Sequence, residues 1–582
     1  MSINENHKRS SETSPPWAAG TETRHHELYP ELTEDEIDIV RRYGIEREVA
    51  DGTVLWDIGD RNTGFFLALD GAIEVFRRDK DGEHSIVTHG SGHYGGEIVT
   101  MSGRGALLAG RAKGHTRALV VSSEKLRELI ATEAMLGEKI LHSFILRRMR
   151  MVAEQLGGIK LVGFGAERDT ARIRMFLFRN GVPHEFIDLD SVEVVEKSLR
   201  AVDATAEDLP LLLCDGRRLS KPSNREIAES LGFAAEFSAD VEFDVAVIGA
   251  GPAGLAAAVY AASEGLSVIV FESCAPGGQA GTTSKIENYL GFPTGISGQA
   301  LAGRAYIQAL KFGAEIAVAR RLIALRCGDP FHDLELDGGD RIKARCVVIA
   351  SGVLYKQPPI EGLNAFEGRG VHYGASYVEA QFCRGKDIVI IGGGNSAGQA
   401  AVHLSAHARA IHIVVREAGL AEGMSNYLIR RIDKIGNIKV LPYTEVQRVE
   451  GEDRISAIVI RDNRTGEMQR LNVSHLFIFI GATPASDFVG DALVLDDKGF
   501  VKTGDALTAE ELHTTGWPFE RRPYLLEASC PRIFAAGDVR AGSGKRVASA
   551  VGEGSICVQF IHQTLTESIS DDKSDDLTPA KY

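Results

Sequence analysis

Residues 241–272 read VEFDVAVIGAGPAGLAAAVYAASEGLSVIVFE and decide the fold of the second half of the chain. The apolar run before Gly249 predicts a buried strand, the Ala-rich run after Gly251 predicts a helix, and SVIVFE predicts a second strand. The glycines at 249, 251 and Gly254 permit a tight turn, close approach of a pyrophosphate and close helix packing. Glu272 ends the second strand, where it can accept a hydrogen bond from a ribose hydroxyl. The stretch therefore predicts a dinucleotide-binding unit.

A second copy of this pattern follows at residues 387–417, which read DIVIIGGGNSAGQAAVHLSAHARAIHIVVRE. Gly392 and Gly394 precede a predicted helix that begins at Asn395 and Ser396, so the same turn is repeated. Two such units in one chain predict two bound nucleotides.

A late block indicates that one of these nucleotides is a flavin, because residues 534–555 read FAAGDVRAGSGKRVASAVGEGS. Asp538 is placed to hold the ribityl chain. A helix that begins at Arg546, Val547 and Ala548 would direct its positive end at the flavin ring, where it stabilises the anionic reduced form.

Length and composition set the wider limits. The chain has 582 residues, which is enough for about four domains and too many for one hydrophobic core. Its 44% of hydrophobic and 25% of charged residues are ordinary for globular proteins and exclude wholesale disorder. The net charge of −15 argues against nucleic acid or an anionic lipid surface as a partner.

The seven cysteines are scattered over positions 214, 274, 327, 346, 383, 530 and 557. Without a C-x-x-C, the spacing excludes a zinc ribbon or a local redox dithiol, and no metal site is predicted. The N-terminus lacks the apolar segment of a secretory signal, and no apolar run approaches the roughly 18 residues of a membrane span. We therefore expect a cytoplasmic protein with no membrane span. Residues 1–25 and the acidic residues 567–582 are expected to be disordered tails.

Residues 26–157 carry short alternating runs separated by Gly and Asp turns, which predict a small antiparallel jelly roll. An amphipathic helix is predicted to follow from about Ser123 to Val152. The stretch resembles a cyclic nucleotide-binding domain, in its Gly59-Asp60, Gly71 and Gly96-Glu97.

The phosphate contact of that family is in doubt here. In the family, the Glu at the position of Glu97 accepts from the ribose, and a later Arg pairs with the cyclic phosphate. That Arg position falls at Ala106 or Leu107, while Arg104 and Arg111 are out of register. Because a phosphate without an arginine loses its strongest contact, we expect a degenerate barrel that serves for docking or for another ligand, with a weak or lost cyclic nucleotide contact through Glu97.

Residues 158–236 predict a second unit, with a strand, a helix, a strand, a further helix, a hairpin and a closing helix. This order resembles glutaredoxin, a thioredoxin-like protein. In that family the first helix opens with a cysteine motif, whereas residues 166–169 read AERD here. Since disulfide exchange needs a thiolate, we expect a docking or glutathione-like surface, or a structural spacer. Leu209-Pro210 stands where the family carries a cis-proline.

Residues 241–566 are similar to the low-molecular-weight thioredoxin reductases, over most of the length of those proteins. Besides the two glycine patterns, the chain shares with them, in order, GGQAGTT, IENYLGFP, VVIASGV, GATP and FAAGDV. The resemblance implies an FAD-binding domain at 240–369 and 483–566 and an NAD(P)H-binding domain at 370–482. It implies hydride transfer from the nicotinamide to the flavin.

The resemblance also implies the residues that bind the cofactors. For FAD they are Gly249, Gly251, Pro252, Ala253, Gly254, Glu272, Gly278, Gln279, Thr282, Asn288, Ser351, Gly352, Gly537, Asp538, Arg546, Val547 and Ala548. For NAD(P)H they are Gly392, Gly394, Asn395, Ser396 and Arg416.

The choice between NADPH and NADH rests on arginines that clamp the 2′-phosphate in this family. Arg416 is present, but Glu417 follows it and Ala421 fills a later arginine position. Arg430 and Arg431 could compensate from the next helix. The sequence favours NADPH and leaves NADH open.

The chain departs from the family at the redox centre. The two positions of the family's Cys-x-x-Cys fall on Gly374 and Tyr377. No thiol remains there to accept electrons, so reduction of thioredoxin through an internal dithiol is not expected. Cys383, His372 and Tyr377 stay as candidates for a catalytic role, although a packed cysteine and two pocket walls are the simpler interpretation.

The sequence thus predicts a multidomain protein with a jelly-roll barrel, a thioredoxin-like domain and two Rossmann-like domains. The predicted function is an FAD-dependent NAD(P)H oxidoreductase with an external acceptor: a disulfide, a quinone, a ferredoxin-like protein or oxygen. Two alternatives stay open. One is a ferredoxin–NADP reductase-like enzyme, although an aromatic segment to cover the flavin is not evident. The other is a flavin or nucleotide redox sensor regulated by the barrel. A homodimer is expected by analogy of fold.

Overall fold

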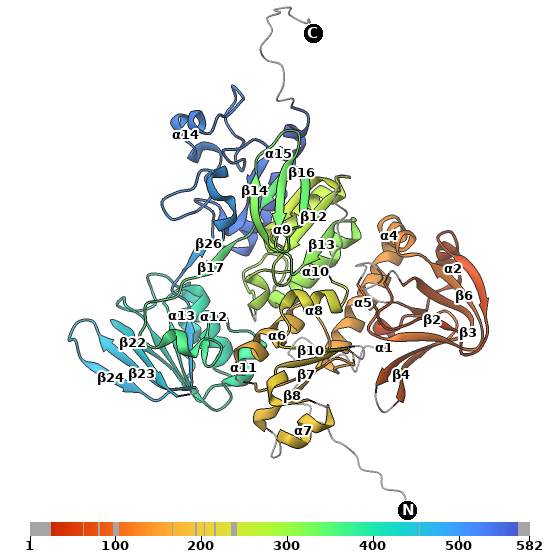
Figure 1. Ribbon diagram of the computed structural model, residues 1–582, viewed down its shortest axis with the longest axis horizontal. Helices are drawn as coiled ribbons and strands as arrows, with labels where there is room; N and C mark the ends of the chain where they lie inside the picture. The colour runs from red at the N-terminus through yellow and green to blue at the C-terminus, as the bar shows by residue number, and fades with distance from the viewer. Residues whose placement is uncertain are drawn as a thin grey trace, which may run out of the picture.

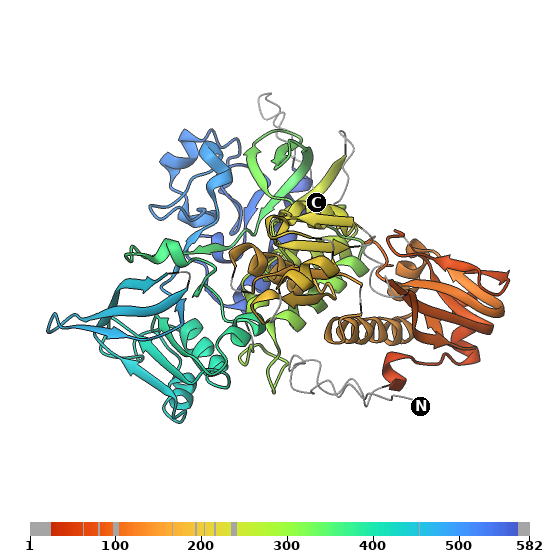
Figure 2. The same ribbon diagram turned by 60° about the horizontal axis from the view of Figure 1, so that its bottom comes forward.

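The computed structural model describes residues 25–567 except 62, 80–81, 97–99, 101–103, 157, 166, 192–194, 203, 215–216, 234–240, 284 and 453. Four units follow one another along the chain (Figure 1). The barrel unit (25–156) and the inserted unit (370–481) lie at opposite ends of the molecule in both views (Figure 1, Figure 2). Between them lie the middle unit (158–233) and the large unit (241–369 and 482–567). Within the described residues, no helix has both the length and the apolar character needed to cross a membrane.

The barrel unit is an antiparallel sheet flanked by helices, in agreement with the predicted jelly roll. Its strands pair in the order β1-β6-β3-β4, with β2 on β6 and β5 on β3. The elements are α1 (His25–Leu28), α2 (Glu34–Arg41), β1 (Ile45–Val49), β2 (Val54–Trp56), β3 (Phe65–Asp79), β4 (Gly82–His89), β5 (Tyr94–Gly95), β6 (Ala109–Val121), α4 (Ser123–Thr132) and α5 (Ala134–Ala153).

The prediction of one continuous helix from Ser123 to Val152 is wrong. Two helices occupy the stretch, and Glu133 between them has the non-helical dihedral angles φ −100° and ψ 79°. Leu129 of α4 and Ile140 of α5 are buried in the same core of the barrel. The bend allows the apolar faces of both helices to reach that core.

The middle unit is a four-stranded sheet of order β10-β9-β7-β8 with helices packed on it. The predicted order of strands and helices is confirmed, and the Leu209–Pro210 peptide is cis. The elements are β7 (Lys160–Gly163), α6 (Arg168–Arg179), β8 (Glu185–Asp188), α7 (Val195–Ala201), β9 (Leu211–Cys214), β10 (Arg217–Ser220) and α8 (Asn224–Ser230).

The large unit is built on a sheet of order β13-β12-β11-β16-β15-β14, with β27 paired to β16. The central strand β11 is buried on both faces: Val245 and Val247 pack in one core, and Ala246 and Ile248 pack in another. Burial on both faces explains why the strand is an unbroken apolar run. The elements are β11 (Glu242–Ile248), α9 (Pro252–Ser263), β12 (Val268–Glu272), α10 (Gly298–Lys311), β13 (Glu315–Val318), β14 (Leu322–Arg326), β15 (His332–Leu336), β16 (Arg341–Ile349), β17 (Val353–Tyr355), β26 (Ala482–Pro484), α14 (Ala509–Thr514), β27 (Ile533–Ala535) and α15 (Val547–Leu565).

The inserted unit has a parallel sheet of order β18-β25-β19-β20-β21 and a separate antiparallel sheet of order β22-β23-β24. The pair β17–β26 joins the two segments by which the chain leaves and re-enters the large unit. The elements are β18 (Val371–His372), α11 (Tyr377–Phe382), β19 (Asp387–Ile391), α12 (Asn395–Leu404), β20 (Ala410–Val414), α13 (Asn426–Ile432), β21 (Ile438–Leu441), β22 (Thr444–Gly451), β23 (Ile455–Asp462), β24 (Met468–Leu471) and β25 (His475–Ile478).

Candidate functional site

The Gly-rich turn between β11 and α9 forms a concave surface of backbone. Gly249 has φ +103°, a left-handed conformation that favours glycine. A Cβ on Gly254 would lie 1.8 Å from the carbonyl oxygen of Gly249, so glycine is needed for α9 to pack this close to the turn. Gly251 caps α9 without a side-chain hydrogen bond, and Pro252 occupies the first turn. The first N–H groups of the helix therefore remain available to a phosphate.

Glu272 holds this turn from the end of β12. Its side chain is 8% exposed, and its carboxylate accepts hydrogen bonds from the N–H groups of Ala250 at 2.9 Å, Cys274 at 2.8 Å and Ala275 at 3.2 Å. The carboxylate thus couples the Gly-rich turn to the loop that follows β12. Binding of a ribose hydroxyl by Glu272 stays a prediction.

The loop after β12 folds over the Gly-rich turn. Gly278 has φ +53°, and a Cβ on it would lie 3.0 Å from Gly251 Cα. The side chain of Gln279 donates to the carbonyl oxygen of Val353 on β17. Thr282 Oγ1 donates to the carbonyl oxygen of Gln279 at 2.8 Å. The loop and the turn together form a cradle lined largely by backbone.

The C-terminal block completes this cradle. A Cβ on Gly537 would lie 2.9 Å from the Cβ of Ala253 in the first turn of α9. Asp538 follows it, half-buried, and this burial raises the pKa of its carboxyl. Arg546 caps α15 without a side-chain hydrogen bond, and Val547 is the first residue of the helix. The first N–H groups of α15 are therefore available to a ligand as well.

The cradle lies at the carboxyl edge of the parallel strands, which is where α/β sheets bind ligands. Ser351 Oγ donates to the carbonyl oxygen of Ala485 at 2.6 Å, and Gly352 has φ +70°, so the segment after β16 borders the same edge. Asn288 is exposed on the segment between the bridged residues Ile286 and Ile296, and its contact with FAD stays a prediction. A pyrophosphate fits a cradle that offers helix N–H groups and lacks Cβ atoms at its glycines.

The inserted unit repeats the device at the end of β19. Gly392 has φ +132°, and a Cβ on it would lie 2.4 Å from the carbonyl oxygen of Phe479. Gly394 caps α12 without a side-chain hydrogen bond, and a Cβ on it would meet nothing within 4 Å. Asn395 and Ser396 are exposed at the start of the helix. This open turn fits the phosphates of a second dinucleotide.

Two of the predicted arginines take different positions. Arg416 is exposed just beyond the end of β20, at the carboxyl edge of the inserted sheet. Arg431 of α13 pairs with Glu287 of the large unit, with 3.2 Å between nitrogen and oxygen. Binding of a 2′-phosphate by Arg416 stays a prediction, while Arg431 joins two units.

The position of the family's first redox cysteine is occupied by Gly374. Gly374 lies next to the cradle, since a Cβ on it would be 3.9 Å from Thr282 Oγ1. Cys383 is fully buried in the core of the inserted unit, and burial raises the pKa of its thiol to about 12. A thiol with this pKa stays protonated at pH 7 and is a poor nucleophile. The structure thus supports the interpretation of Cys383 as a packed residue.

His372 forms a pair with His475, in which Nε2 of His372 lies 3.0 Å from Nδ1 of His475. Burial lowers the pKa of both imidazoles, that of His475 to about 4, so both are neutral at pH 7. The rings of Phe382 and Phe477 stack on His372, with centroid distances of 6.2 and 4.7 Å. A catalytic role for His372 stays a prediction, and the side chain of Tyr377 lies outside the described residues.

The middle unit contacts the cradle through Arg179, a contact that no sequence motif indicates. Arg179 at the end of α6 donates to the carbonyl oxygens of Gly278 at 2.8 Å and Ala275 at 3.3 Å. The same unit reaches the inserted unit, where Asp190 pairs with Arg454 at 2.9 Å. The partners of Arg179 are main-chain atoms almost a hundred residues away, so neither their type nor their spacing leaves a signal in the sequence.

A cavity of about 510 Å³ lies between the middle unit and the inserted unit. Its lining has six cationic side chains, Arg168, Arg172, Arg369, Arg384, Lys386 and Arg454. Three carboxylates also line it, Asp188, Asp190 and Glu379. Three of the six are ion-paired, Arg168 with Glu367, Arg172 with Asp169 and Arg454 with Asp190. The positive charge that remains, in a chain of net charge −15, favours an anionic ligand.

The barrel unit uses its two candidate arginines for other contacts. Arg104 is 8% exposed, and its guanidinium lies 4.1 Å from the centre of the Phe233 ring and donates to Asn180 O at 3.3 Å. Ala106 and Leu107, at the expected arginine position, are buried and apolar. Arg104 therefore docks the barrel unit against the middle unit.

Arg111 is also engaged. Its guanidinium pairs with Glu74 of the neighbouring strand β3 at 2.8 Å and with Glu83 of β4, the strand beyond it, at 2.6 Å. Glu97, the predicted ribose contact, lies outside the described residues. The described part of the barrel thus places neither candidate arginine as a dedicated phosphate ligand.

Comparison with known proteins gives two family matches. The family model for pyridine nucleotide-disulphide oxidoreductases matches residues 243–554. The family model for cyclic nucleotide-binding domains matches residues 46–133. Among curated relatives, the chain is 34% identical to a thioredoxin reductase of Treponema pallidum over 54% of this chain and 95% of that protein. It is 32% identical to that of Bacillus subtilis over 56% of this chain and 95% of that protein. The solved structure of a thioredoxin reductase of Lactococcus lactis, in its FR conformation, is similar to this chain with 27% sequence identity and a TM-score of 0.50. The match covers 56% of this chain and 99% of the Lactococcus lactis chain.

Proposed function

The chain belongs to the pyridine nucleotide-disulphide oxidoreductase family, and from this premise we propose that it transfers electrons from NAD(P)H to an acceptor outside the chain without an internal dithiol. It is an FAD-dependent oxidoreductase of the thioredoxin reductase type, with FAD and NADPH as its cofactors. Its N-terminal barrel is a cyclic nucleotide-binding domain by family.

The observation that carries the proposal is the placement of the cysteines, all seven of which are described. Four are buried in cores, Cys214, Cys346, Cys383 and Cys557. Cys274 is half-buried, and the remaining two, Cys327 and Cys530, are bonded to each other. Because Gly374 stands at the contact between the inserted unit and the cradle, electrons have no sulfur relay there. If the electrons go to a disulfide, that disulfide must belong to the acceptor molecule, which has to bring it directly to the flavin.

We assign FAD to residues 240–369 and 483–566, and NAD(P)H to residues 370–482. FAD, when bound, supplies a ring that accepts a hydride and releases electrons. The chain would hold the pyrophosphate at the Gly-rich turn, the ribose at Glu272 and the ribityl chain at Asp538. Arg416 supports NADPH over NADH.

The acceptor is expected to be anionic, since the cavity between the middle and inserted units carries an excess of cations. We assign residues 158–236 to a thioredoxin-like, glutaredoxin-related domain without thiols, on the basis of its element order, and give it the role of a docking surface. We also propose that the enzyme acts in the cytoplasm as a homodimer.

Anaerobic titration with NADPH tests the proposal. About one equivalent of NADPH per FAD should bleach the flavin completely, because no disulfide lies at the cradle to accept a second electron pair. The Cys383→Ala variant should need the same equivalent and keep its turnover with an artificial acceptor within about twofold, since that thiol is protonated and packed. Uptake of two equivalents, or loss of turnover in Cys383→Ala, contradicts the proposal.

A redox sensor is the second candidate, and the contacts of the middle unit with both nucleotide-binding units favour it. A screen of reoxidation by small disulfides, quinones, an acidic ferredoxin and oxygen separates the two candidates. Rapid reoxidation by one of them identifies an enzyme, whereas reduced flavin that persists with all of them identifies a sensor.

We expect the barrel to bind cyclic AMP and cyclic GMP no more tightly than millimolar, because Arg104 and Arg111 are held by other groups. Isothermal calorimetry on the full chain, at up to millimolar ligand, measures this directly. Arg111→Ala is the matched control and should leave the absence of binding unchanged. A micromolar titration that Arg111→Ala abolishes would show that Arg111 leaves its carboxylates to bind the phosphate.

A further inference from the structure

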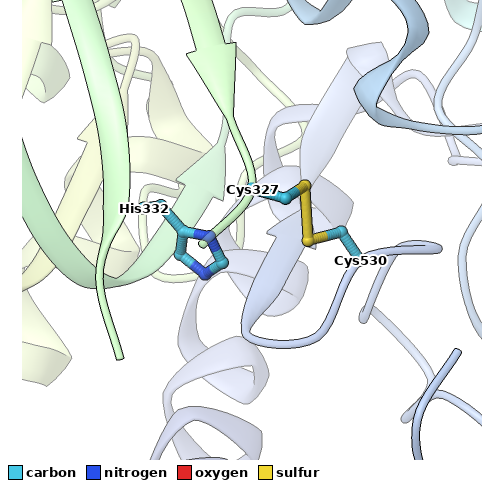
Figure 3. Close-up of side chains that lie close together, drawn as sticks. All are labelled: Cys327, His332 and Cys530. Carbon is cyan, nitrogen blue, oxygen red and sulfur yellow. A yellow bond between two sulfur atoms is a disulfide. The ribbon is translucent and has the colours of Figure 1, made fainter. Parts of the chain in front are cut away.

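Two cysteines and a histidine meet in the large unit, far from the cradle. Cys327 follows β14, His332 begins β15, and Cys530 precedes β27. A disulfide joins the cysteines, and Figure 3 shows the ring of His332 beside it. One ring nitrogen and the two sulfur atoms lie within 4.8 Å of one another. The sequence did not indicate this group, because 203 residues separate the two cysteines.

The group lies at the amino edge of the sheet, opposite the cradle. Ile349 at the end of β16 pairs with Ile248, which leads into the Gly-rich turn. Val347 pairs with Ile533 at the start of β27, and Cys530 comes just before that strand. The disulfide and the Gly-rich turn are therefore separated by the length of the strands, so the pair is independent of the cofactor site.

The two sulfur atoms differ in access. Cys327 is exposed and Cys530 is partly buried. The exposed Cys327 is thus the sulfur that a reagent in solution reaches first, and Cys530 is its resolving partner.

The disulfide Cys327–Cys530 joins two segments that are far apart in the sequence. The loop that it closes contains the whole inserted unit, residues 370–481. The disulfide therefore joins the two separate segments of the large unit, which are otherwise held by noncovalent contacts such as β16–β27. A cross-link that closes so long a loop restricts the unfolded chain strongly.

We propose that Cys327 and Cys530 form a reversible redox pair that reacts with low-molecular-weight disulfides and locks the two segments of the large unit together. The thiolate of Cys327 attacks one sulfur of the small disulfide, which forms a mixed disulfide and releases one small thiol. The thiol of Cys530 loses its proton and attacks Cys327 Sγ, which releases the second small thiol. Two protein thiols and one small disulfide thus become one protein disulfide and two small thiols.

The test uses the purified full chain, reduced and then equilibrated with glutathione disulfide. Free thiols, counted in denaturant with a colorimetric disulfide reagent, should fall from seven to five. Peptide mass mapping should show one cross-link between the peptides of Cys327 and Cys530. The oxidised protein should melt about 5 °C above the reduced protein, because the cross-link restricts the unfolded chain.

Two variants control the experiment. Cys327→Ser should lose both the fall in thiol count and the difference in melting temperature. Cys383→Ala, which removes a cysteine outside the pair, should still lose two thiols and keep the difference. If Cys327→Ser folds poorly, peptide mass mapping of the unmodified protein still shows whether Cys327 and Cys530 are cross-linked.

Three results would overturn the proposal. The first is a thiol count that stays at seven under glutathione disulfide. The second is a cross-link that involves other cysteines. The third is one zinc ion per reduced chain that Cys327→Ser loses, because two sulfur atoms and the His332 nitrogen would then be a metal site closed by a fourth ligand.

Discussion

The Gly254→Ala variant is expected to lose FAD on purification and to bind it at least about a hundredfold more weakly than the parent protein. The added Cβ would lie 1.8 Å from the carbonyl oxygen of Gly249, a main-chain atom that cannot rotate away. Relieving this overlap moves α9 off the turn and costs about 3 kcal/mol, which corresponds to that loss of affinity if the distortion is confined to the cradle.

The measurement is the ratio of flavin to protein absorbance after gel filtration, followed by a titration with FAD monitored by fluorescence. Gly303→Ala is the matched control, because a Cβ on Gly303 in α10 would meet nothing within 4 Å. That control should bind FAD as the parent does and gain about 1 kcal/mol of stability from its higher helix propensity. Equal FAD binding by Gly254→Ala would show that the close approach of helix and turn is not needed.

The Glu272→Gln variant is expected to lower the free energy of unfolding by about 2–3 kcal/mol and to weaken FAD binding about tenfold. The carboxylate accepts from the N–H groups of Ala250, Cys274 and Ala275, one oxygen for the first and the other for the remaining two. The amide of glutamine offers one acceptor, and its NH₂ group must face an N–H that it cannot satisfy. A buried donor without a partner costs about 1–3 kcal/mol.

Chemical denaturation of the FAD-free protein and FAD titration measure the two effects separately. The matched control is Glu264→Gln in the same βαβ unit, where the exposed carboxylate pairs with His562 and should contribute less than about 1 kcal/mol. If Glu272→Gln unfolds like this control, Glu272 does not hold the turn. If only FAD binding falls, its role is confined to the ligand.

The sequence predicted the elements that depend on local rules. The turns at Gly249 and Gly392 were predicted because their positive φ values and their close main-chain neighbours allow little but glycine. The buried strand β11 was predicted because a strand covered on both faces needs an unbroken apolar run. The helix predicted over Ser123–Val152 was wrong because periodicity shows which face is apolar but not that Glu133 bends the chain to bring two faces to one core.

The part of the candidate site that the sequence indicated also depends on local rules. The glycines, Glu272 and Asp538 stand at fixed distances within one βαβ unit or one loop, so their spacing carries information. The role of Glu272 in holding three N–H groups was not predicted, because the turn and loop that donate them become neighbours only after the strands pair. Cys383 was interpreted as a packed cysteine because it precedes a predicted buried strand, and its burial supports this interpretation.

What the sequence determined by itself was the pair of dinucleotide turns and the lack of sulfur at Gly374, both of which are properties of residue type at a position. The tertiary structure alone decided that Arg179 binds the loop at Gly278 and that Cys327 meets Cys530. The physical reason is distance along the chain. A turn is constrained by its own few residues, whereas these contacts form between segments far apart in the sequence that only tertiary packing brings together.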